Sequence, residues 1–226
     1  MKICVVRIDK MGDMLLTLPI LQGLKKANDK LIIDIVCSDN NLKVCNNISI
    51  INKTFTFSKR ISDIWSIIRS IRKQNYDYIY SFSPGWMSII LSIFSNSKSK
   101  SLLILKSRYK SGIFSKVTEI IFCKMFFNHI NIIDRNLYFK QNKSINQSKL
   151  MQELVKKSGL VILENEMINN LFKFDKINYG QKEICLIHLS SKWINKYFSE
   201  NQFINLLYKL ESTGKNIVMS SDQFSK

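Results

Sequence analysis

The first nineteen residues constrain the fold of this 226-residue chain more than any other stretch. Residues 3–8 form an almost unbroken apolar, β-branched run, which is typical of a strand buried on both faces of a parallel sheet. After a short polar turn, Met14, Leu18 and Leu21 follow the i, i+4, i+7 spacing of a helix. Pro19 lacks a backbone donor, so we expect that helix to bend. Strand, glycine-containing turn and helix predict the first unit of an α/β fold.

The polar turn contains Asp13, which we place at or near the N-cap of the helix. Backbone N–H groups and the helix dipole favour a carboxylate there. Loops at the carboxyl ends of parallel strands are also where open α/β sheets bind ligands. The residues alone leave two interpretations open: an ordinary capping aspartate, or a catalytic carboxylate that faces a crevice.

The rest of the chain continues the alternation of strands and helices, which predicts a parallel sheet with right-handed crossovers. Strands are expected at residues 31–37, 53–57 (half-buried or at an edge), 78–82, 101–105, 184–188 and 216–219. Helices are expected at residues 62–73, 86–94, 113–127, 149–158 and 199–210. No clear period emerges between residues 160 and 180, so we expect a linker there.

The chain is strongly basic, with 34 Lys and Arg against 17 Asp and Glu, for a net charge of +17. This charge favours a polyanionic partner: nucleic acid, anionic lipid or a phosphorylated glycan. A bias of the coding sequence toward Lys, Asn and Ile is the alternative explanation.

The five cysteines are scattered and odd in number, which indicates a reducing compartment and hence the cytoplasm. With two histidines, no metal site is expected. No stretch has the length of a signal peptide or a membrane span.

Two stretches carry a family resemblance. The start of the chain reads Arg7-x-Asp9-Lys10-Met11-Gly12-Asp13-x-Leu15-x-x-x-Pro19, and residues 75–81 read Asn-Tyr-Asp-Tyr-Ile-Tyr-Ser. Both resemble the heptosyltransferases, bacterial inverting glycosyltransferases that move a heptose from ADP-heptose onto the lipopolysaccharide core. The resemblance implies that Asp13 is the general base, that no cofactor is needed, and that the acceptor is an anionic glycolipid.

The resemblance also implies the GT-B architecture, in which two Rossmann-like domains of parallel sheet face each other across a cleft. Residues 1–160 are expected to form the acceptor-side domain, and residues 161–182 the linker. Residues 183–226 are expected to form the incomplete start of a nucleotide-sugar-binding domain. The family's later donor-binding motif has no counterpart, so the chain is expected to be truncated at its C-terminus.

The second domain repeats the sequence of strand, polar turn and helix. Hydroxyl and lysine side chains near a helix N-terminus suit a diphosphate. On the resemblance, Ser190, Ser191 and Lys196 contact the phosphates of the donor, and Lys192 is the alternative to Lys196 because the loop departs from the family pattern. From the residues alone, an ordinary polar loop is the alternative.

Basic residues at two other strand ends are acceptor candidates. The resemblance assigns Lys59 and Arg60, which follow the third strand, to anionic groups of the acceptor, and Lys10 is a similar case. Solvated surface charges are the alternative.

The helix expected at residues 113–127 is strongly apolar. We favour packing of this helix against the sheet or a neighbouring domain. The alternative is peripheral contact with the cytoplasmic face of the inner membrane.

The function predicted from the sequence is transfer of a sugar, expected to be heptose from ADP-heptose, to a lipopolysaccharide core or related glycan with inversion. One alternative is an inactive or non-catalytic fragment of such an enzyme. The other is a basic nucleic-acid-binding protein, although no nucleic acid is expected because no RNA-binding motif is present. The G-x-G-x-x-G and Walker A fingerprints are absent as well.

Overall fold

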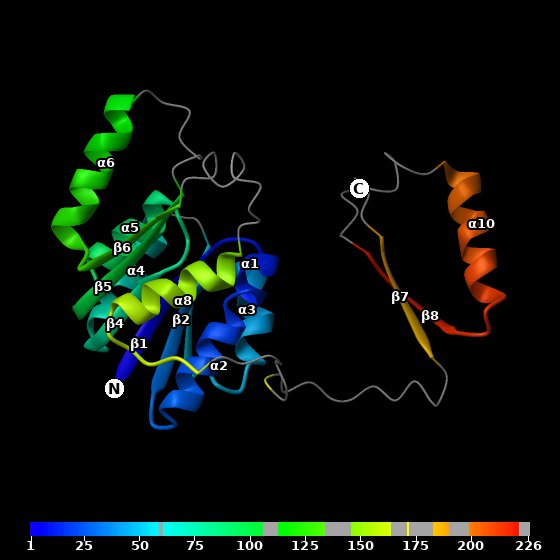
Figure 1. The fold of residues 1–226 in the computed structure, drawn as a ribbon, viewed down its shortest axis with the longest axis horizontal. Coiled ribbons are helices and arrows are strands. Elements are labelled where there is room, and N and C mark those ends of the chain that lie inside the picture. The colour runs from blue at the N-terminus through cyan, green and yellow to red at the C-terminus, as the bar shows by residue number, and fades with distance from the viewer. Residues whose placement is uncertain are drawn as a thin grey trace. The chain divides into compact units, whose positions relative to one another are not determined.

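A computed structural model describes residues 1–58, 61–105, 113–133, 146–163, 171, 183–189 and 199–221. They belong to two compact units, Met1–Phe174 and Asp175–Lys226 (Figure 1). The division lies within the predicted linker. Ile162 and Leu171, which also fall in that range, are buried in the core of the first unit.

The first unit contains a parallel sheet, as predicted. It has six strands, one more than expected, in the order β3-β2-β1-β4-β5-β6. Its strands are β1 (Lys2–Arg7), β2 (Ile32–Ser38), β3 (Lys53–Phe57), β4 (Tyr76–Ser81), β5 (Ser97–Leu105) and β6 (His129–Ile133). The chain moves outward from β1 to β3 and then returns to β4 on the other side of β1. The order therefore reverses between β1 and β4, and the crevice outside their carboxyl ends is the usual ligand position in open α/β sheets.

Helices cover both faces of this sheet (Figure 1). They are α1 (Met11–Leu15), α2 (Leu18–Ala27), α3 (Asp39–Asn46), α4 (Ile61–Arg72), α5 (Trp86–Ile93), α6 (Ile113–Phe126) and α8 (Gln147–Lys157). Alternate residues of a strand point to opposite faces, so Ile3 and Val5 pack with α2, α3 and α8, while Cys4 and Val6 pack with α4 and α5. Cys123 of α6 packs with α5 and β5 on the second face.

The helix predicted after β1 is two helices. α1 ends at Leu15, and α2 begins at Leu18 with Pro19 in its first turn. A proline is tolerated there because the first N–H groups of a helix have no intrahelical acceptor. The expected bend is therefore a break. Met14, Leu18 and Leu21 are nevertheless all buried, as their spacing predicted.

The second unit consists of β7 (Ile184–Leu189), α10 (Glu200–Glu211) and β8 (Asn216–Ser221), and the two strands pair in parallel. A capping box begins α10: the Gln202 N–H donates to Ser199 Oγ at 3.3 Å, and the Ser199 N–H donates to Gln202 Oε1 at 2.9 Å. No residue of α10 is buried. The strand–helix–strand order predicted for this segment is confirmed.

Substituting Gly23 in the middle of α2 is expected to destabilise the first unit. A Cβ atom there would press on the Leu163 carbonyl oxygen and lie 2.8 Å from Ile162 Cγ1. Alanine gains about 1 kcal/mol of helix propensity over glycine, but overpacking costs about 1–3 kcal/mol. For Gly23→Ala we therefore expect the free energy of unfolding, measured with urea, to fall by about 1 kcal/mol. In Gly12→Ala, where the Cβ meets nothing within 4 Å, stability should be unchanged or slightly higher; equal behaviour of the two variants would contradict the close packing.

Candidate active site

The loop after β1 is held between its two neighbouring strand ends. On one side, the Ile8 N–H donates to Ser83 Oγ at 2.9 Å. On the other, the Asp9 carbonyl oxygen accepts hydrogen bonds from Ser38 Oγ at 3.3 Å and Asn41 Nδ2 at 3.0 Å. Because side chains at or just after the ends of β2 and β4 both bind this loop, its backbone has a fixed position at the point where the strand order reverses.

Asp13 lies in the first turn of α1, and Lys10 is the N-cap residue. Asp13 is thus near the N-cap but not at it. Its backbone carbonyl accepts a hydrogen bond from Thr17 Oγ1 at 3.0 Å. Its side chain is 29% exposed, so the carboxylate is accessible to a ligand. Lys10 is exposed beside it.

A buried arginine holds the Asp13 carboxylate. Arg7, at the end of β1, is 2% exposed. Its guanidinium lies 3.5 Å from Asp13 Oδ1 and 3.4 Å from Asp9 Oδ2. Its Nε donates to the Asp13 carbonyl oxygen at 3.0 Å, Nη1 donates to the Phe82 carbonyl oxygen, and Nη2 donates to Gln147 Oε1 at 3.4 Å. One cation therefore ties together β1, α1, the loop after β4, and α8.

Arg7 belongs to the N-terminal motif, but no role was predicted for it from the sequence. The signal was present, because charged side chains are almost never buried without partners and Arg7 ends an apolar strand. The other predicted site residues lie outside the described part of the chain; they are Lys59, Arg60, Ser190, Ser191, Lys192 and Lys196.

The described residues contain no group of three or more His, Cys, Asp or Glu side chains placed to hold a metal ion. Within the same residues, no helix combines the length and apolar character needed to cross a bilayer. All five cysteines are free, and only Cys185 is not buried. Burial raises the pKa of the Cys4 thiol far above its ordinary value, so this thiol is unreactive.

Comparison with known proteins shows which proteins the chain is similar to. No model of a protein family matches it. It is 22% identical over 217 residues to lipopolysaccharide heptosyltransferase 3 of Escherichia coli, a match that covers 93% of this chain and 61% of that protein. The resemblance to the heptosyltransferases is confirmed. The chain spans 61% of the length of this curated relative.

Solved heptosyltransferase structures share the fold. WaaC of Escherichia coli, solved with ADP, aligns with a TM-score of 0.68 and 16% identity over 97% of this chain and 67% of its own. Heptosyltransferase II of the same organism aligns with a TM-score of 0.66 and 13% identity, covering 97% of this chain and 64% of its own. A family 9 glycosyltransferase from Veillonella parvula aligns with a TM-score of 0.69 and 15% identity, covering 96% of this chain and 61% of its own. The predicted Rossmann-like fold of heptosyltransferase type is therefore confirmed.

Proposed function

We propose that the chain belongs to a glycosyltransferase that moves heptose from ADP-heptose to a lipopolysaccharide core or related glycan, with inversion. The observation that carries the proposal is the partly exposed Asp13 carboxylate, held by the buried Arg7 where the strand order reverses. The similarity to heptosyltransferases supports the same assignment. Residues 1–160 would form the acceptor side and residues 183–226 the start of the donor side, joined by the linker at 161–182.

The proposed reaction is a direct displacement. Asp13 takes the proton of an acceptor hydroxyl while that oxygen attacks the anomeric carbon of the donor. The bond from the anomeric carbon to the diphosphate breaks on the opposite face, which inverts the configuration and releases ADP. Arg7 touches neither substrate. It orients the carboxylate through the contact at 3.5 Å and leaves its outer side open to the acceptor.

The remaining predicted residues complete this proposal. Ser190 and Ser191, with Lys196 or Lys192, would bind the donor diphosphate near the N-terminus of α10, where positive charge stabilises the leaving group. Lys10, Lys59 and Arg60 would meet anionic groups of the acceptor. The acceptor is proposed to be an anionic glycolipid, which would place the protein in the cytoplasm at the inner membrane.

The test is a transfer assay on the protein as its native cell makes it. ADP-heptose is mixed with heptose-deficient lipopolysaccharide core; the expected results are release of ADP and an acceptor mass increased by one heptose. ADP-heptose binding without turnover would support a non-catalytic protein instead. Sequence-indifferent DNA binding that weakens steeply with salt, with no response to ADP-heptose, would support the nucleic-acid interpretation and overturn the proposal.

A further inference from the structure

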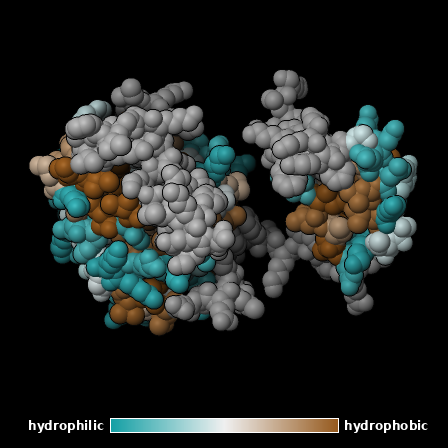
Figure 2. All heavy atoms as spheres, turned by 45° about the horizontal axis from the view of Figure 1, so that its top comes forward, coloured by the Kyte–Doolittle hydropathy of each residue, from teal (hydrophilic) through white to brown (hydrophobic). Residues whose placement is uncertain are grey.

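The two helical layers of the first unit differ in what they expose. The helices α2, α3 and α8 expose no large hydrophobic side chain, although Leu16, Val161 and Leu163 beside them are exposed. In the described part of the other layer, formed by α4, α5 with its C-cap, and α6, eight such side chains are at least 38% exposed: Trp65, Trp86, Met87, Phe94, Ile121, Phe122, Met125 and Phe126. Figure 2 shows a hydrophobic patch on the left side of the first unit, on the side where Figure 1 places α6. We call the outer surface of this layer the α4–α6 face.

The aromatic rings of this face link its helices. The ring of Trp86 on α5 lies 6.3 Å from that of Phe122 on α6, and Phe122 lies 4.9 Å from Phe126, measured between centroids. Trp65 on α4 lies 6.0 Å from Phe94 at the end of α5. The inward side of α6 packs against the sheet through Cys123, as predicted for this helix. In the part of α6 whose side chains are described, residues 120–126, Ile121, Phe122, Met125 and Phe126 are exposed.

Positive charge lies beside these rings. Arg69, Arg72 and Lys73 line a surface hollow of about 500 Å³ together with Trp65, Ile68 and Asn96. All three cations are exposed, and none has an ion-pair partner among the described residues. Burial and the charge of Arg72 lower the pKa of nearby Lys100, which is consistent with concentrated positive charge.

The basic composition of the chain does not explain why this face combines positive charge with exposed hydrophobic side chains. The opposite layer is also basic, with Lys25, Lys26, Lys43, Lys149, Lys156 and Lys157, but it exposes no large hydrophobic side chain on its helices. Exposed aromatic rings next to cations favour the interface of an anionic bilayer, where rings enter the headgroup region and cations meet lipid phosphates. A second copy of the chain is a poorer occupant, because a net charge of +17 on each copy would repel it.

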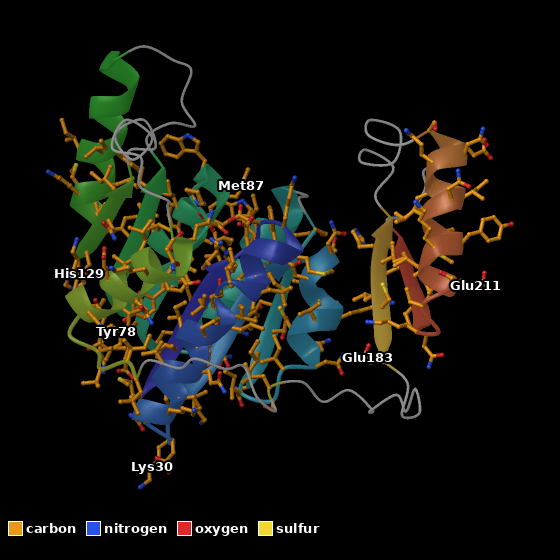
Figure 3. The ribbon with its side chains drawn as sticks, turned by 45° about the vertical axis from the view of Figure 1, so that its right-hand side comes forward. Lys30, Tyr78, Met87, His129, Glu183 and Glu211 are labelled. Carbon is orange, nitrogen blue, oxygen red and sulfur yellow. The ribbon has the colours of Figure 1, made fainter. Side chains whose placement is uncertain are left out.

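We propose that the α4–α6 face docks on a bilayer rich in anionic lipids. Ile121, Met125 and the aromatic rings enter the headgroup region, while Arg69, Arg72 and Lys73 bind lipid phosphates. The face borders the candidate active site, since α5 begins just after the loop that binds Ile8. Figure 3 shows Met87 at the same end of the first unit as α1 and far from Lys30. If the proposed function holds, a lipid-anchored acceptor would reach Asp13 from the membrane.

The test measures binding to vesicles of pure phosphatidylcholine and of phosphatidylcholine with phosphatidylglycerol, in flotation assays without donor or acceptor. We expect binding to the anionic vesicles alone. Met125→Glu should weaken it about tenfold, because a charge replaces an inserted apolar side chain. The matched control is Val161→Glu, which makes the same charge change at a similarly exposed site, 70% against 75%, and should change binding less than twofold. Arg72→Gln should weaken binding about fivefold, and Lys157→Gln on α8 much less.

Equal effects of Met125→Glu and Val161→Glu would overturn the proposal, as would equal binding to both kinds of vesicle. Sedimentation provides a further test: a dimer that Met125→Glu dissociates would assign the face to a second copy and also overturn it. Because the assay contains no sugar donor, its failure leaves the proposed transfer reaction unaffected. Conversely, a protein that binds vesicles normally but transfers no sugar would overturn the proposed function alone.

Discussion

Replacing Asp13 with asparagine is expected to slow sugar transfer by about 10²–10⁴-fold, the usual contribution of a general base. Asparagine has nearly the same shape and keeps an oxygen for the Arg7 guanidinium, but it cannot take the proton of the acceptor hydroxyl. The fold should survive, because the Asp13 side chain is 29% exposed and Asp9, whose Oδ2 lies 3.4 Å from Arg7 Nη1, still provides a negative charge for the buried guanidinium. The measurement is the initial rate of ADP release, with the melting temperature recorded in parallel.

The matched control is Asp29→Asn, a substitution of the same chemistry in the exposed turn before β2. It should leave the rate unchanged. A base that acts in the transition state is expected to affect kcat and leave KM nearly unaltered. Near-normal turnover of Asp13→Asn would exclude the base assignment, and a rise in KM alone would reassign Asp13 to acceptor binding.

Replacing Arg7 with methionine is expected to have the largest effect on stability, a loss of about 3–5 kcal/mol in the free energy of unfolding. Methionine fills a similar volume but leaves Asp9 and Asp13 without their cation and the Phe82 carbonyl oxygen without its donor. Urea unfolding of the first unit, followed by circular dichroism, gives the value. Arg7→Lys keeps the charge but loses the planar fork, so its stability should fall between those of the wild type and Arg7→Met.

Lys98 provides the control for the arginine. Its amine lies 2.7 Å from Asp77 Oδ1, a shorter ion pair than those of Arg7, but its side chain is 82% exposed. Lys98→Met should therefore cost much less stability than Arg7→Met. If Arg7→Met cost no more than Lys98→Met, the idea that a buried cation organises the site would be wrong.

Most of the sheet could be predicted because its strands are apolar runs between clear turn signals. The strand at residues 53–57 was predicted with its observed bounds, and its position at the edge of the sheet is confirmed. β6 was not predicted. It begins at His129, three residues after α6 ends at Phe126. Only Phe127 and Asn128 separate the two elements, and no glycine or proline marks the change from helix to strand.

The site could be predicted in part. The position of Asp13 after a buried strand follows from local sequence. Its contact with Arg7 does not, because the arginine is positioned by tertiary partners such as Phe82 and Gln147, which local periodicity cannot reveal. The break between α1 and α2 was predicted only as a bend, since Pro19 limits the backbone without fixing which residues leave the helix.

The contact between Arg7 and Gln147 has a consequence for how the protein is made. The two residues are 140 positions apart, so a growing chain completes β1, Asp13 and most of the sheet long before α8 leaves the ribosome. Until then one partner of Arg7 is missing, as is the helix that covers α2 through Met151 and Leu154. Domains generally fold as units during synthesis, so β1 and its loop wait for the last element of their domain. In this protein, the earliest residues to be translated would reach their final environment among the last.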